Sequence, residues 1–125
     1  DDKPLVLREQ AVVRACLGLF LAEAWPGLDK DTAFTLGLFS LLDAFVDIPI
    51  DYLCDRLNLA DDLKLALINR SGDGGEMLNL AIQMERGDWQ ALATLQGKPV
   101  ITDEWLANRY SQALAHARNL ISALQ

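Results

Sequence analysis

The sequence predicts an all-α fold, and three observations favour that class. Leucine and alanine supply 40 of the 125 residues, whereas valine and isoleucine together supply only 11, a balance that favours helices over strands. Apolar residues recur at helical spacing, and glycines, prolines and capping residues separate the apolar segments. The length suits one domain with its own core. We therefore expect residues 1–125 to form a single-domain bundle of about seven helices.

The first two helices are expected to form the centre of the bundle. Residues 4–25 are apolar on nearly every side over their second half, and residues 32–46, with Asp31 as N-cap, are the most apolar segment of the chain. Each segment has one internal glycine, Gly18 and Gly37. Because glycine weakens a helix by about 1 kcal/mol relative to alanine, we expect both glycines to lie where the two helices cross.

Shorter helices and one long last helix are expected in the rest of the chain. Pro49 suits the first turn of a helix, and Asp73 with Glu76 forms a capping-box pattern ahead of another. Gly87 suits a helix C-terminus, and Thr102 suits the N-cap of the last helix. The predicted ranges are 49–57, 60–69, 74–86, 89–95 and 103–124.

Charge and hydropathy argue against nucleic-acid and membrane partners. The net charge is −7, with 18 acidic and 11 basic residues, whereas a nucleic-acid surface has to be basic. The longest apolar run without a charge, residues 15–22, is far shorter than the roughly 20 residues of a membrane span. We expect a cytoplasmic protein. Because the chain begins with Asp1 rather than methionine, we also expect it to be a piece of a longer protein.

The residue types that usually carry catalysis are scarce. His116 is the only histidine, and Cys16 and Cys54 lie in apolar helical segments without the spacing of a metal site. We expect two buried thiols and a structural histidine. The residues therefore predict no catalytic group, no metal ion and no cofactor.

One polar group interrupts the most apolar segment. Ser40, Asp43 and Asp47 are spaced three and four residues apart, so on a continuous helix they share one face. That face is either a polar pocket or partner contact, or the solvated seam of a central helix. Two carboxylates without a nearby base do not make an acid–base pair.

Two strings carry a family resemblance: AFTLGLFSLLDAFVDIPIDYLCDRLNLADDLKLALI at residues 33–68 and LNLAIQMERGDW at residues 78–89. They resemble the C-terminal half of an HDOD domain, and more narrowly the divergent HDOD tail that follows EAL domains in bacterial cyclic-di-GMP signalling proteins. The helix over residues 4–25, with Arg14, fits the helix that precedes these strings in that family. The resemblance implies a partial HD/HDOD-like helical fold. It also implies an absent upstream region, in which an EAL domain could be a phosphodiesterase.

The resemblance also bears on metal binding. HDOD domains are related to HD-type phosphohydrolases, which bind metal through a His-Asp pair a few residues after a glycine. Here that glycine corresponds to Gly37, and Ser40 and Leu41 stand at the His-Asp positions. The resemblance therefore implies that the metal site is lost and that this chain is not an enzyme.

Taken with the family, the sequence predicts a regulatory module that transmits signals by protein–protein or intramolecular contact in a cyclic-di-GMP or response-regulator pathway. The expected partners are another protein, an upstream domain of the same chain, or a second copy in a homodimer. One alternative is a degenerate metallophosphohydrolase that retains a nucleotide pocket around Ser40, Asp43 and Asp47, although that face offers only acids to a phosphate. Another is a helical adaptor for an unrelated partner.

Overall fold

The structure is a computed structural model that describes residues 3–87 and 102–124. Over these ranges the chain is all-α, which confirms the predicted fold class. The predicted helix over residues 89–95 lies outside them. The elements are α1 (Lys3–Leu21), a 3-10 turn η1 (Ala22–Ala24), α2 (Lys30–Phe39), α3 (Leu42–Val46), α4 (Ile50–Arg56), α5 (Asp61–Asn69), α6 (Gly72–Arg86) and α7 (Asp103–Leu124).

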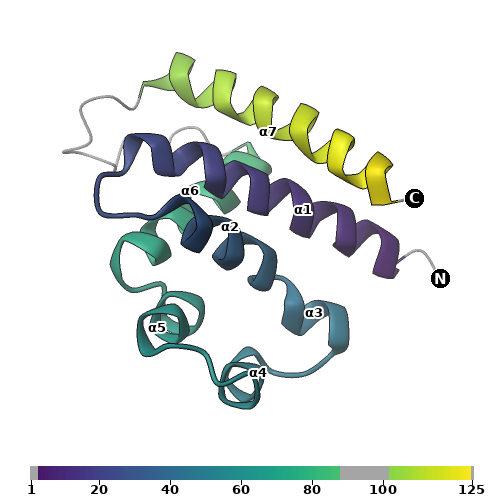
Figure 1. Cartoon of the computed structure of the whole chain (residues 1–125), viewed down its shortest axis with the longest axis vertical. Coiled ribbons are helices and arrows are strands. Elements are labelled where there is room, and N and C mark those ends of the chain that lie inside the picture. Colours follow the sequence, from purple (N-terminus) through teal and green to yellow (C-terminus); the bar gives the residue numbers. More distant parts are fainter. Residues whose placement is uncertain (1–2, 88–101, 125) are drawn as a thin grey trace.

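Helix α1 lies at the centre of the bundle. It packs against α2, α6 and α7, and α7 runs antiparallel along it so that the start of α1 and the end of α7 lie on the same side (Figure 1). Helices α3, α4 and α5 continue from α2 away from α7 (Figure 1). A helix covered on several sides has to be apolar on several sides, which explains the composition of α1.

The core fills the space around α1. Large side chains with less than 2% exposure come from five of the helices and from the residue that follows η1, and they include Leu17, Leu21, Trp25, Leu36, Met77, Leu78, Leu80, Met84 and Leu106. Helix α6 contributes the most to this set, because its apolar residues face both α1 and α5.

The crossing of α1 and α2 confirms the prediction for the two glycines. A β-carbon on Gly37 would lie 2.5 Å from the carbonyl oxygen of Arg14 and 2.8 Å from the Cα of Ala15. On the partner helix α1, a β-carbon on Gly18 would lie 2.6 Å from the carbonyl oxygen of Ala33 in α2. Both positions therefore allow backbone-to-backbone approach that any larger residue would prevent.

The prediction of one continuous helix over residues 32–46 is wrong. Helix α2 starts earlier, at Lys30, with Asp29 rather than Asp31 as N-cap, and the Asp29 carboxylate accepts a hydrogen bond of 2.9 Å from the Thr32 amide. The helix then stops at Phe39. The Ser40 hydroxyl donates to the Gly37 carbonyl at 2.8 Å, a side-chain bond that competes with helical backbone bonding.

The capping box predicted for α6 is also wrong. The helix begins at Gly72, and the side chain of Asp73 does not cap it; its Oδ1 accepts a hydrogen bond of 3.2 Å from the indole Nε1 of Trp25. Trp25 is 1% exposed, and a buried indole N–H needs an acceptor.

Several helix ends follow the sequence. Pro49 precedes α4 as its N-cap residue, one position before the predicted first turn, and Gly87 ends α6 in a left-handed conformation with a φ of 72°. The Thr102 hydroxyl caps α7 by accepting a hydrogen bond of 3.1 Å from the Trp105 amide. None of the helices in the described ranges is long and apolar enough to cross a membrane.

Candidate functional site

The structure separates the three residues of the predicted polar face. Ser40 is half-buried at the end of α2, Asp43 is half-buried in the first turn of α3, and Asp47 is exposed at the end of α3 with a φ of 59°. The Asp43 carboxylate accepts a hydrogen bond from the Ala44 amide. Because the helix breaks at Ser40, these residues do not form the helical face that their spacing predicts.

A buried arginine organises the region around Ser40. Arg14 is 5% exposed, and its Nη1 donates to the Ser40 hydroxyl at 3.1 Å. Its Nε and Nη2 donate to the two carboxylate oxygens of Glu85 at 2.8 and 2.9 Å. The amide of Gln10 also donates to Glu85, at 3.3 Å. This network ties α1, α2 and α6 together.

The pairing of Arg14 with Glu85 makes the burial of both charges tolerable. The side chains are 7% and 10% exposed, so each is largely removed from water. A buried charge is strongly unfavourable unless it is paired and hydrogen-bonded, and a bidentate arginine–carboxylate contact satisfies both conditions.

Two further arginines line a cavity next to this pair. The cavity has a volume of about 360 Å³. Arg70 reaches it from the end of α5 and Arg86 from the end of α6. We call it the arginine cavity, and its lining residues are Gln10, Arg14, Leu41, Arg70, Ile82, Glu85 and Arg86.

Arg70 is the least satisfied residue of the cavity. Its Nη1 is buried without a hydrogen-bond partner, and it is one of two such side-chain atoms among the described residues. Burial lowers the pKa of Arg70, the nearby charge of Arg14 lowers it further, and Asp43 raises it. The guanidinium still carries its charge at neutral pH, because arginine titrates far above that range.

The prediction that the region around Ser40 offers only acids to a phosphate is wrong, because the arginine cavity lies beside it. The structure brings Arg14, Arg70 and Arg86 together from distant parts of the chain. No local spacing predicts that meeting. The one signal in the sequence is Arg14 itself, a charged residue directly before the uncharged apolar run of the first helix.

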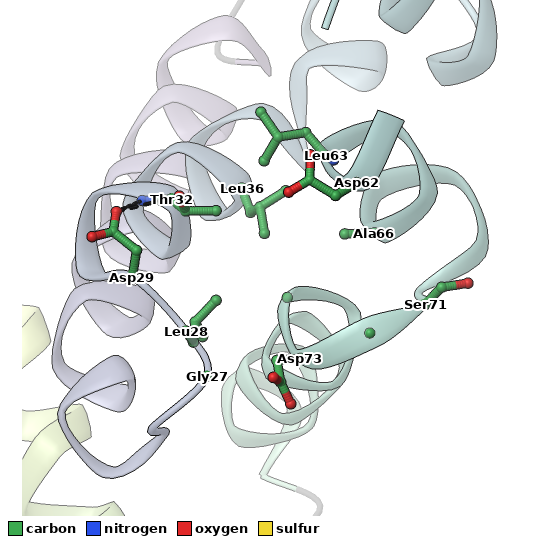
Figure 2. Close-up of a pocket in the computed structure, with 12 residues that line it drawn as sticks. Gly27, Leu28, Asp29, Thr32, Leu36, Asp62, Leu63, Ala66, Ser71 and Asp73 are labelled. Carbon is green, nitrogen blue, oxygen red and sulfur yellow. Dashed lines mark hydrogen bonds between the residues drawn. The ribbon is translucent and has the colours of Figure 1, made fainter. Parts of the chain in front are cut away.

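A second cavity lies where α2, α5 and α6 begin. Figure 2 shows its polar side chains: Asp29 and Thr32 from α2, Asp62 from α5, and Ser71 and Asp73 at the start of α6. Its volume is about 300 Å³. All three carboxylates are already engaged: they accept hydrogen bonds from the Thr32 amide, the Leu63 amide and the Trp25 indole.

Metal-binding groups do not gather at this cavity or elsewhere in the described residues. In those residues no three side chains of histidine, cysteine, aspartate or glutamate are grouped so that they could hold a metal ion. Cys16 and Cys54 are buried free thiols, as predicted. Burial raises the pKa of Cys16 to about 11, and His116 packs edge-on against the ring of Phe20 with ring centroids 5.8 Å apart.

An apolar groove opens between α1 and the α2–α3 junction. It has a volume of about 210 Å³, and Arg8 is the only charged residue among those that line it. Leu38 and Leu42 are half-buried in this groove. We call it the apolar groove, and its lining residues are Arg8, Ala11, Val12, Leu38, Phe39, Leu41 and Leu42.

Comparison with known proteins finds similarity to a region of a cyclic-di-GMP phosphodiesterase. It is 46% identical over 63 residues to the cyclic-di-GMP phosphodiesterase CdgJ of Vibrio cholerae, covering 50% of this chain and 15% of CdgJ. It is 26% identical over 113 residues to the uncharacterized protein YuxH of Bacillus subtilis, covering 90% of this chain and 27% of YuxH. The chain thus spans less than a third of either relative. No family model and no solved structure matches it.

Proposed function

We propose that this chain is a non-catalytic regulatory module of bacterial cyclic-di-GMP signalling that acts by contact with a protein partner or with another domain of its own protein. The observation that carries the proposal is the 46% identity to a region of a cyclic-di-GMP phosphodiesterase. The family we assign is the HDOD tail that accompanies EAL domains. The proposed location is the cytoplasm.

The contacts of Ser40 support the absence of catalysis. Ser40 and Leu41 stand where the resemblance places a metal-binding His-Asp pair, and the Ser40 hydroxyl accepts a hydrogen bond from Arg14 Nη1. A guanidinium 3.1 Å from this position is a fixed positive charge, and a metal cation bound beside it would be repelled. The Arg14 side chain therefore opposes the binding of a cation at Ser40.

The apolar groove supports action by contact. It is open, and its lining is apolar apart from Arg8. Apolar side chains left open to solvent are typical of surfaces that a partner covers. The chain as a whole is acidic, with a net charge of −7, so the groove is a local apolar site on an acidic protein.

The experiment is a titration of this chain into purified CdgJ from which the segment similar to this chain has been removed. We expect a saturable change of at least twofold in the rate of cyclic-di-GMP hydrolysis. Leu38→Lys, in the groove, should abolish the change, whereas Leu65→Lys, on an exposed part of α5, should preserve it. An unchanged rate would overturn the proposed regulation and favour an adaptor for an unrelated partner. Hydrolysis of a phosphodiester by the chain alone, dependent on added metal, would overturn the non-catalytic assignment.

A further inference from the structure

We propose that the arginine cavity is a binding site for the phosphate group of a small anionic ligand. This inference goes beyond regulation by protein contact, and it rests on Arg70 and Arg86, neither of which lines the apolar groove. The cavity is formed by the described residues alone and has a volume of about 360 Å³, within the usual range for small-molecule sites.

The charge of the cavity is opposite to that of the chain. Three of the seven arginines line it, and Glu85 is its one acidic lining residue, whereas the whole chain carries a net charge of −7. Like charges gathered in one place are unfavourable, because Arg14 and Arg70 repel each other in a partly buried setting. An anion in the cavity would remove that repulsion.

Arg70 has a hydrogen-bond donor without a partner, and an anion binds to such donors. Its Nη1 is buried and has no hydrogen-bond acceptor. A buried donor without a partner is unfavourable, and more so when it is charged, so such atoms are rare in native proteins unless a ligand or water satisfies them. Arg70 lines the cavity, so an oxyanion there would become the missing acceptor once the Arg70 side chain turns toward it.

Glu85 does not block an anion, because Arg14 already neutralises it. Both carboxylate oxygens of Glu85 accept hydrogen bonds from Arg14, at 2.8 and 2.9 Å. Positive charge remains on Arg70 and Arg86, offset in part at Arg70 by the nearby Asp43 carboxylate. Arginine binds phosphate groups through paired N–H donors, and two guanidinium groups can balance a doubly charged phosphate.

The test uses inorganic phosphate and pyrophosphate as probes in a calorimetric titration of the whole chain, with sodium chloride at matched ionic strength as the salt control. We expect one saturable site for at least one probe and no site for chloride. Arg70→Ala and Arg86→Ala should each weaken binding at least tenfold. Arg118→Ala removes an exposed arginine of α7 that does not line the cavity, and it should bind as the wild type does.

Arg86 is exposed at the end of α6, so its replacement keeps the test valid if Arg70→Ala fails to fold. Absence of heat with both probes would overturn the proposal. Equal binding by wild type and by Arg86→Ala would also overturn it, because the anion would then sit elsewhere.

Discussion

Replacing Gly37 tests whether the α1–α2 crossing sets the stability of the fold. A β-carbon at this position would lie 2.5–2.8 Å from backbone atoms of Arg14 and Ala15, which cannot rotate away. Overpacking of this kind destabilises by about 1–3 kcal/mol, and contact with backbone places it at the upper end. Alanine gains about 1 kcal/mol of helix propensity over glycine, so we expect Gly37→Ala to destabilise by about 1–2 kcal/mol net. Gly37→Leu, with a larger side chain, should not fold.

Thermal and urea unfolding followed by circular dichroism measure the effect. For a chain of this size, a loss of 1–2 kcal/mol corresponds to a melting temperature lower by about 4–8 °C. Gly74→Ala is the matched control, because a β-carbon there would meet the end of the Leu36 side chain, which can move. That variant should remain within about 1 kcal/mol of wild type. A Gly37→Ala protein as stable as wild type would refute the close backbone crossing.

Three further predictions test the buried charges, the thiols and the surface. Glu85→Ala should destabilise the protein by about 3–5 kcal/mol in urea titration, because it leaves buried Arg14 unpaired. Glu23→Ala breaks an exposed pair with Arg109 and should change stability by less than about 1 kcal/mol. Equal effects would contradict the burial argument. Burial raises the pKa of Cys16 from 9.0 to about 11, so as pH rises the thiol loses its proton in the unfolded chain first. The free energy of unfolding should therefore fall as pH rises from 9 to 11, and it should fall less steeply in Cys16→Ala. An identical pH dependence of the two proteins would exclude Cys16 as the cause. Because the apolar groove is open and the chain carries a charge of −7, sedimentation should show self-association that strengthens as salt screens the charge, and a monomer at every salt concentration would contradict this.

Local chemistry in the sequence predicted most of the secondary structure. Gly87 ends α6 and Thr102 caps α7 as expected, because glycine at a left-handed position and a hydroxyl at an N-cap act through neighbouring residues only. The two glycines of the α1–α2 crossing were also predictable, since a glycine inside an apolar helix is unfavourable without a packing reason.

Two of the errors involve a bond to a residue far along the chain. Asp73 fits a capping box, but Trp25 lies 48 residues earlier and claims its carboxylate. Ser40 fits the interior of a helix, but its hydroxyl bonds to Gly37 and accepts from Arg14. In both cases a donor far away in the sequence bonds to the residue, and periodicity contains no information about such a donor.

The close crossing and the arginine cavity are connected through one residue. Gly37 lies against the carbonyl of Arg14, so the absence of a side chain at Gly37 brings α2 close to the α1 backbone at this residue. Three residues later Ser40 then lies within hydrogen-bond distance of the Arg14 guanidinium, and the helix ends there. The buried guanidinium in turn requires Glu85, which fixes the end of α6, and with it Arg86, beside Arg70. A larger side chain at position 37 would push α1 and α2 apart and would therefore disturb anion binding as well as stability. A Gly37→Ala protein that still folds should bind phosphate more weakly, although no ligand contact has been removed.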